Sequence, residues 1–326
     1  MPRYVIHIGP HKTGTTYLQV LFRQLAPQLR QRGIFYPLEW VGDHSPGHVR
    51  LVQRLRAGQD EVLADEFDAL HASAYEIVLI SAEDLSILPR ESVALLKSYL
   101  REQPVSILFY FRGWLGLLPS SWQEVVKHGR SMTFPEFTLQ QCLEPLASNT
   151  INYGVRIDPF AEAFGRENLC FVSYNNIVEQ GGDLGEHFFR SFLSWMDAPL
   201  TRGIRPNPSL DILDVEAIRA FNALECTDGP ERAARYLRMK PQLDLSIAFA
   251  AMERNRQALR FSEDASHLRR IHAELFEKYG DRLMPPRSDR YFFFPKENAL
   301  KYIKETYLME NGVLESLRAV CGQIRE

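Results

Sequence analysis

A short apolar run, followed at once by a glycine-bounded loop and a helical pattern, most limits how this 326-residue chain can fold. Residues 4–8 read Tyr-Val-Ile-His-Ile, a run typical of a central parallel strand. Gly9 and Gly14 allow the positive φ angles and close backbone approach that a turn around an anion needs. Thr15 and Thr16 then begin a helical pattern that runs to Arg32 and ends at Gly33, and the unpaired N–H groups and dipole at its start point back into the loop. The pattern predicts a site for a phosphate-like anion.

The position of the lysine separates two classes of anion-binding loop. In the nucleotide triphosphatase pattern G-x-x-x-x-G-K-[ST], the lysine directly follows the second glycine and reaches the β- and γ-phosphates. The spacing from Gly9 to Gly14 fits, but Thr15 stands where that lysine belongs and the basic residue is Lys12. The order Lys-Thr-Gly-Thr-Thr at residues 12–16 closely resembles the 5′-phosphosulfate loop of sulfotransferases that use 3′-phosphoadenosine 5′-phosphosulfate (PAPS).

This resemblance implies a donor, a product and a set of binding residues. PAPS would be the donor co-substrate and PAP the product, with no metal ion expected. Lys12 would also act in catalysis, by stabilising the charge that develops on the leaving oxygen. The residues that the resemblance assigns to donor binding in this loop are His11, Lys12, Thr13, Gly14, Thr15 and Thr16.

A second segment, residues 112–129, resembles the 3′-phosphate-binding part of the same enzymes. Arg112 follows an apolar run at residues 105–111, and Ser120 lies on the helical stretch that comes next. In those sulfotransferases an arginine at a strand end and a serine on the next helix hold the 3′-phosphate of PAPS. A guanidinium offers a planar fork to a dianion and a hydroxyl adds a neutral donor. We therefore expect Arg112 and Ser120 to bind the donor, with Ser121 as the alternative register.

Sulfuryl transfer also needs a base that takes the proton of the acceptor hydroxyl, and we expect this base near the end of a neighbouring strand. The apolar run at residues 76–81 ends just before Glu83 and Asp84, and ligands of open parallel sheets bind outside such ends. Several carbohydrate sulfotransferases use a glutamate near this place, so Glu83 is the first candidate. His48 is a competing base, and His11 competes too but is favoured as a loop contact. The alternative for Glu83 is a structural one, capping the following helix.

Apolar runs at residues 4–8, 76–81, 105–111 and 168–174 alternate with helical patterns. This indicates an α/β protein with a doubly wound, mainly parallel sheet flanked by helices. We assign residues 1–283 to a sulfotransferase-like α/β domain that is helix-rich from about 211. Residues 284–326 are assigned to a helical C-terminal extension, packed on the domain or on a partner in a homo-oligomer. It contains an aromatic run at residues 291–294 and a helical stretch from residue 298 to about 321. A rigid loop at 205–209 stands where relatives close over the nucleotide, but it lacks their Arg-Lys-Gly run.

Composition excludes several classes of protein. With a net charge of −3 there is no global basic field to hold nucleic acid, so any anion site must be local. The four cysteines have neither zinc-site nor regular disulfide spacing, and we expect them to be reduced. No apolar run approaches the roughly 20 residues that span a bilayer, and no signal-peptide pattern is found at the start. We expect a cytoplasmic protein.

Together these features predict transfer of a sulfuryl group from PAPS to a hydroxyl of a carbohydrate or other small molecule. Two alternatives stay open. The first is a P-loop kinase or nucleotide hydrolase, because Glu83 and Asp84 after an apolar strand also resemble the acidic motif that organises Mg²⁺. The second is a non-catalytic nucleotide-binding scaffold, which would bind PAP without turnover.

Overall fold

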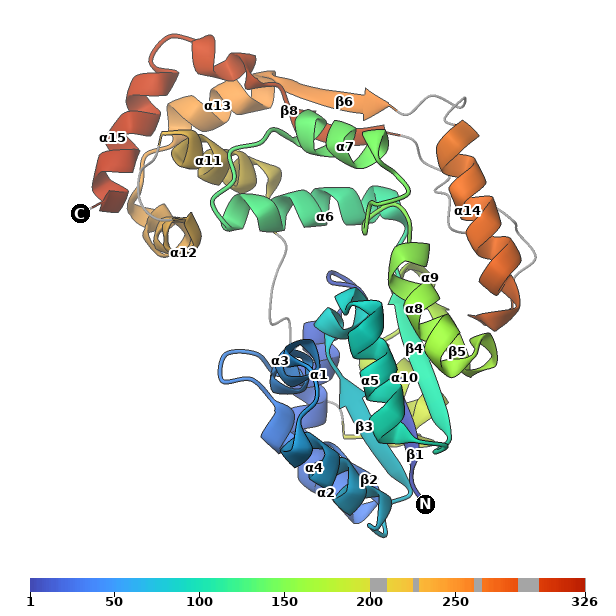
Figure 1. Ribbon diagram of the computed structural model, residues 1–326. Helices are drawn as coiled ribbons and strands as arrows, with labels where there is room; N and C mark the ends of the chain where they lie inside the picture. Colours follow the sequence, from blue (N-terminus) through green and yellow to red (C-terminus); the bar gives the residue numbers. More distant parts are fainter. Residues whose placement is uncertain (200–209, 225–228, 261–265, 287–298, 326) are drawn as a thin grey trace. The chain divides into compact units, whose positions relative to one another are not determined.

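The structure, a computed structural model, describes residues 1–199, 210–224, 229–260, 266–286 and 299–325. The chain divides into two compact units (Figure 1). The first, here called the sheet unit, comprises Met1–Gly113, Asn152–Asn207 and Ile271–Phe293. The second, the helical unit, comprises Trp114–Ile151, Pro208–Arg270 and Phe294–Glu326.

The sheet unit is built on six parallel strands in the order β2-β3-β1-β4-β5-β7. The α/β class with a parallel sheet is therefore confirmed, and each of the four expected strands is present to within one or two residues at its ends. The two edge strands, β2 and β7, are each only two residues long. The strands are β1 Arg3–His7, β2 Ile34–Phe35, β3 Ile77–Ser81, β4 Val105–Phe111, β5 Leu169–Ser173 and β7 Leu283–Met284.

Helices cover both faces of this sheet because successive residues of a buried strand point to opposite sides. Val5 of β1 packs in one cluster with apolar side chains of α1 (Thr15–Gln24), α2 (Ala26–Gln31) and α10 (Leu184–Phe192). Its neighbour Tyr4 contacts Phe67 of α4 on the other side, with ring centroids 6.2 Å apart. Figure 1 shows α5 on that second face. The remaining helices of the sheet unit are α3 Val49–Ala57, α4 Glu61–His71, α5 Arg90–Leu100, α8 Gly154–Phe164 and α9 Tyr174–Glu179.

The helix expected over residues 15–32 is two helices. α1 ends at Gln24, and α2 begins at Ala26 with Pro27 in its first turn. Proline has no N–H to donate and its ring clashes with the preceding turn, so it is tolerated at a helix start but not in the interior. Gly33, at φ 72°, then ends α2 as expected.

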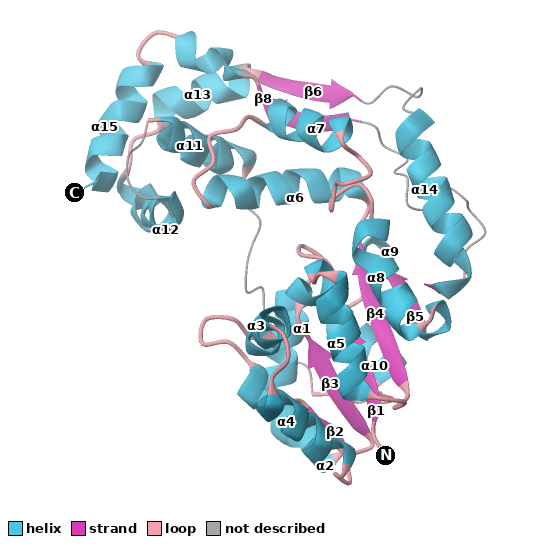
Figure 2. Ribbon diagram, viewed as in Figure 1, coloured by secondary structure: helices cyan, strands magenta, loops and turns pink. Residues whose placement is uncertain are grey.

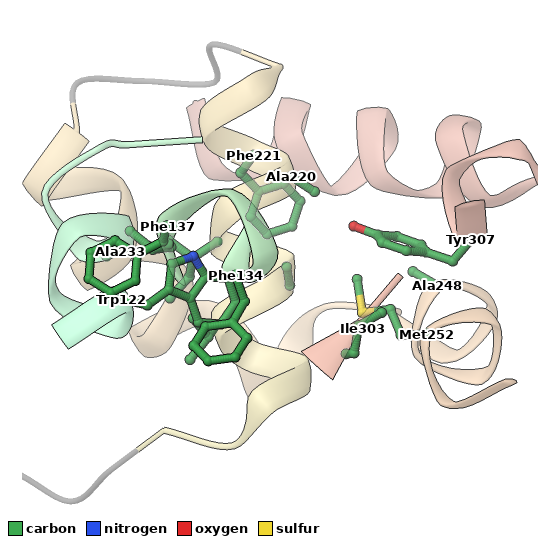
Figure 3. Packing of buried hydrophobic residues seen from close by; sticks show 14 of the residues in the cluster. Trp122, Phe134, Phe137, Ala220, Phe221, Ala233, Ala248, Met252, Ile303 and Tyr307 are labelled. Atoms are coloured by element: carbon green, nitrogen blue, oxygen red, sulfur yellow. The ribbon is translucent and has the colours of Figure 1, made fainter. Parts of the chain in front are cut away.

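The helical unit consists mainly of helices (Figure 2), and it has its own apolar core around α11. All residues of α11 from 214 to 222 are buried. Figure 3 shows Trp122 packed with Phe134 and Phe137, and Tyr307 beside Met252. The elements are α6 Trp114–Lys127, α7 Phe134–Leu143, α11 Ile212–Ala223, α12 Gly229–Met239, α13 Ser246–Arg254, α15 Val313–Arg325 and the antiparallel pair β6 Arg256–Arg260 and β8 Ala299–Ile303; α14, Ser266–Tyr279, begins in this unit and ends in the sheet unit.

α15 packs on α11 and α13 in the helical unit, and the expected division at residue 283 stays a prediction. Two expectations about the C-terminal region differ from the structure. The helix expected from residue 298 to 321 is wrong at its start: residues 299–303 form β8, whose backbone pairs with Arg256–Arg260. Cys142 and Cys170 are free, whereas Cys321 is disulfide-bonded, so the expectation of reduced thiols is wrong for Cys321.

Two segments singled out in the sequence, residues 205–209 and the aromatic run at 291–294, lie outside the described residues. Among the residues that are described, none of the helices combines the length and the apolar character that crossing a membrane requires.

Candidate functional site

The loop between β1 and α1 has an unusual backbone. Lys12 and Gly14 both have positive φ angles, 71° and 77°. Thr13 Oγ1 donates to the Pro10 carbonyl at 2.7 Å, which closes the turn from inside. The positive φ angle of Gly14 strains any other residue there, and an added Cβ would also meet the end of the Leu184 side chain, so the position favours glycine. Gly14 is also the N-cap of α1, and no side chain caps this helix. The first N–H groups of α1 therefore stay available to an anion.

Glu83 connects this loop to the end of β3. It begins the short 3-10 helix Glu83–Ile87, directly after the strand. Its Oε2 accepts from Thr15 Oγ1 at 2.5 Å and lies 3.2 Å from His11 Nδ1. Its other oxygen, Oε1, accepts no hydrogen bond from the described residues. The side chain is 27% exposed. Glu83 is thus fixed through one oxygen and keeps the other open.

His11 bridges two carboxylates. Its Nε2 lies 3.1 Å from Asp84 Oδ1, while its Nδ1 faces Glu83. Burial acts to lower the pKa of His11, but the bonds to Asp84 and Glu83 outweigh it and raise that pKa to about 9. For Glu83, burial acts to raise the pKa, and the bonds from His11 and Thr15 bring it below its usual value. We call these four residues, His11, Thr15, Glu83 and Asp84, the strand-end cluster.

Arg112 lies on the other side of the loop, directly after β4. Its Nη1 donates to the Lys12 carbonyl at 3.4 Å, and its guanidinium carbon is 5.8 Å from the centre of the Tyr174 ring. The Tyr153 hydroxyl donates to the carbonyl of Arg112, and the backbone amide of Gly113 donates to Asn175 Oδ1. The chain leaves β1 toward β2 and leaves β4 toward β5, so Lys12 and Arg112 meet at the point where the strand order reverses. Ligands of open α/β sheets bind at such points.

His48 has a different setting. Its side chain is fully buried, stacks on Tyr36 with ring centroids 4.2 Å apart, and accepts from the Ser81 amide through Nδ1 at 3.1 Å. Its own amide donates to the Ser81 carbonyl at 2.9 Å. Burial lowers the pKa of His48 to about 3. This geometry favours a role in holding the end of β3 over the role of acceptor base.

Ser120 lies on α6, in the helical unit, and its Oγ donates to the Gly116 carbonyl at 3.3 Å. Ser121 is on the same helix. The expectation that Ser120 joins Arg112 in binding a 3′-phosphate stays a prediction. Thr16 follows Thr15 in the first turn of α1, as expected.

Arg156 is a buried residue of α8 that was not among the residues expected from the sequence. Its Nη1 donates to Ser86 Oγ at 2.8 Å, and Ser86 Oγ donates in turn to the Glu83 carbonyl at 2.8 Å. Arg156 thereby holds the short helix that carries Glu83 and Asp84. A single arginine on an otherwise ordinary helical pattern carries no sequence signal of this role. Within the described residues, no group of three or more His, Cys, Asp or Glu side chains is arranged to hold a metal ion.

Comparison with known proteins adds little. No family model matches the chain, and no curated protein matches it. Among solved structures, the chain is similar to a sulfotransferase from Alicyclobacillus acidocaldarius, at 15% sequence identity and a TM-score of 0.39, over 69% of this chain and 93% of that one. At that level the similarity does not establish a shared function.

Proposed function

We propose that this protein is a sulfotransferase, which moves a sulfuryl group from PAPS to a hydroxyl of a carbohydrate or other small molecule. One observation carries the proposal. A lysine-bearing loop with an uncapped helix N-terminus lies at the end of β1, and the Glu83 carboxylate is held beside it by Thr15. This combination supports the proposal, because the transfer requires donors for an anion beside a proton acceptor.

The residues present fit the donor. The N–H groups at the start of α1 and the side chain of Lys12 suit the 5′-phosphosulfate, since positive φ angles such as those of Lys12 and Gly14 are typical of loops whose backbone N–H groups bind an anion. Arg112, next to the same loop, suits the 3′-phosphate, and Ser120 is its predicted companion. When bound, PAPS supplies an activated sulfuryl group on a good leaving oxygen.

Transfer of that group needs two contributions from the protein. Negative charge grows on the bridging oxygen as the bond to sulfur breaks, and Lys12 with the N-terminus of α1 would stabilise that charge. The acceptor hydroxyl loses its proton as the new S–O bond forms. Glu83 would take this proton on Oε1, because Oε2 is already engaged by Thr15 and His11.

The kinase or nucleotide hydrolase alternative draws on Glu83 and Asp84 as Mg²⁺ ligands. Two features count against it. Thr15 occupies the position of the P-loop lysine, and the histidine of the strand-end cluster bonds to both carboxylates that would have to hold the metal. The scaffold alternative differs from our proposal only in turnover, so it must be separated by assay.

Thermal unfolding with added ligands tests the proposal. PAP in EDTA should stabilise the protein, by about 2.7 kcal/mol at one hundred times its dissociation constant, and Mg-ATP should stabilise it less. PAPS should then be converted to PAP when a panel of hydroxyl compounds is offered. Stabilisation by Mg-ATP alone, with turnover restored by Mg²⁺ after EDTA, would favour the kinase. PAP binding without turnover of any acceptor would favour the scaffold.

A further inference from the structure

We propose that His11 is a positioning residue that carries a proton on both ring nitrogens in the resting enzyme. Its positive charge keeps Glu83 ionised and keeps the loop between β1 and α1 fixed to the end of β3. The effect on catalysis rests on the proposed function. The protonation of His11 does not, and it can be measured without any nucleotide.

The argument begins with the partners of the imidazole. Nδ1 faces Glu83 at 3.2 Å and Nε2 faces Asp84 at 3.1 Å. An ionised carboxylate only accepts hydrogen bonds, and a neutral imidazole has one donor nitrogen and one acceptor nitrogen. A neutral His11 would therefore set a lone pair against one carboxylate. Only the imidazolium donates to both.

The charged groups around His11 also favour its imidazolium form. The cluster brings two carboxylates together, and the Thr15 hydroxyl donates to one of them. From α8, Arg156 acts on both carboxylates, and from α3, Arg56 acts on Asp84. These two arginines favour ionised carboxylates, which in turn favour a charged His11. Lys12 is the charged residue that directly follows His11 in the sequence.

Two consequences follow for a site that binds an anion. Without a positive charge, Glu83 and Asp84 would repel the phosphosulfate bound at the neighbouring loop; the imidazolium offsets one of their two charges. The imidazolium also opposes protonation of Glu83, which burial would otherwise favour. His11 thus acts through Glu83 and through the loop, since it lies between Pro10 and Lys12 and is bonded to the end of β3.

Nuclear magnetic resonance of the histidine rings in the full-length protein tests the protonation directly. The signal of His11, identified by its loss in His11→Gln, should titrate with a midpoint near 9. In Asp84→Asn the midpoint should fall by about one to three pH units, the range for loss of a close opposite charge. The matched control is Asp65→Asn, a solvent-exposed change on α4, which should leave the midpoint unchanged.

A midpoint near the ordinary 6.5 in the wild type overturns the inference, as does one that Asp84→Asn leaves in place. If Asp84→Asn fails to fold in a thermal unfolding scan, Glu83→Gln removes the other carboxylate and should produce the same downward shift. These readouts need no PAPS, so a negative result for the proposed function leaves them intact.

A kinetic readout separates positioning from simple support of the fold. In His11→Gln the acidic limb of the rate–pH profile should move upward by about one unit or more, because Glu83 loses its charged partner. The rate on the plateau above that limb should change less than the rate below it. A uniform loss at every pH, with the limb in its original place, would assign His11 a structural role only.

Discussion

The two units each contain a cluster of charged side chains, and the two clusters differ in how completely the fold pairs their charges. In the helical unit, Arg219 of α11 is 1% exposed and donates through Nε and Nη2 to Glu216, which is 2% exposed. Its Nη1 bonds to Glu305 and to the Ser131 carbonyl. Every nitrogen of this guanidinium is used by the fold itself. We call Glu216, Arg219 and Glu305 the α11 cluster.

The strand-end cluster of the sheet unit is satisfied less completely. Its charged members are 27% to 45% exposed, and Glu83 Oε1 has no partner among the described residues. It also stands beside an uncapped helix N-terminus at the end of a central strand. Buried charge alone therefore does not indicate function: Arg219 and Glu216 of the α11 cluster are buried and paired with each other, with Glu305 as the exposed member, whereas the strand-end cluster leaves one oxygen of Glu83 without a partner among the described residues.

The largest effect is expected from Glu83→Gln, which keeps the shape of the side chain and removes its ability to take a proton. Turnover should fall by roughly 10²- to 10⁴-fold while PAP affinity persists. Steady-state kinetics and calorimetric PAP titration measure the two quantities, with Glu91→Gln on the exposed side of α5 as the matched control. A Glu83→Gln enzyme that stays active, with an acidic limb near pH 6.5 that disappears in His48→Asn, would transfer the role to His48.

Arg219→Met tests whether the α11 cluster contributes to stability. Removing one member of a buried ion pair leaves an uncompensated charge, so we expect a loss of about 3–5 kcal/mol in the free energy of unfolding. Urea denaturation measures it. The double variant Arg219→Met/Glu216→Leu should recover part of the loss, because no buried carboxylate is then left unpaired. A loss below about 1 kcal/mol in the free energy of unfolding of the single variant would contradict a buried ion pair between Arg219 and Glu216.

Arg112→Ala should weaken PAP binding by about 2–4 kcal/mol, as expected for removal of a charge-assisted pair. Binding of adenosine 5′-phosphosulfate, which lacks the 3′-phosphate, serves as the internal control and should barely change. Isothermal titration of both nucleotides provides the comparison. Equal losses for the two ligands would remove Arg112 from the 3′-phosphate site.

The smallest effect is on stability as a function of pH. The pKa of His11 is raised from 6.5 to about 9, so its charge contributes stability that is fully present below about pH 6.5 and is lost as pH rises through 9. Because the side chain is 45% exposed, the gain should stay below about 1 kcal/mol. Unfolding of wild type and His11→Gln at pH 6, 8 and 10 tests this. A difference that grows with pH would have the wrong sign for a charged His11.

Much of the sheet unit was predictable because its signals are local. A β-branched run, a glycine at a fixed place and a helix start lie within twenty residues, so the loop and the first βα unit follow from the sequence. The position of Glu83 at the end of a strand was predictable for the same reason, since it follows an apolar run, and its role as a base stays a prediction. Its bonds come from Thr15 and His11, 68 and 72 residues earlier, and the pairing of β1 with β3 brings these residues together.

The secondary structure of the helical unit was less predictable, because it depends on pairing between residues that are far apart in the sequence. Residues 299–303 have apolar positions that suit either a helix or a strand, and pairing with Arg256–Arg260 decides for the strand. The buried polar residues of α11 resemble a solvated helix face in sequence. His48 shows the same limit within the sheet unit, since a histidine in a polar stretch gives no sign that it will be fully buried against Tyr36.

Turnover of PAPS by Lys12→Ala in metal-free buffer tests whether the loop between β1 and α1 promotes sulfuryl transfer. Lys12 should matter more for transfer than for binding, because its charge counts most when the leaving oxygen becomes anionic. We expect kcat to fall by roughly 10²- to 10⁴-fold with PAP affinity changed much less, while Lys301→Ala, at an exposed position of β8, stays at the wild-type rate. A Lys12→Ala enzyme with near-normal kcat and only weakened affinity would contradict the account.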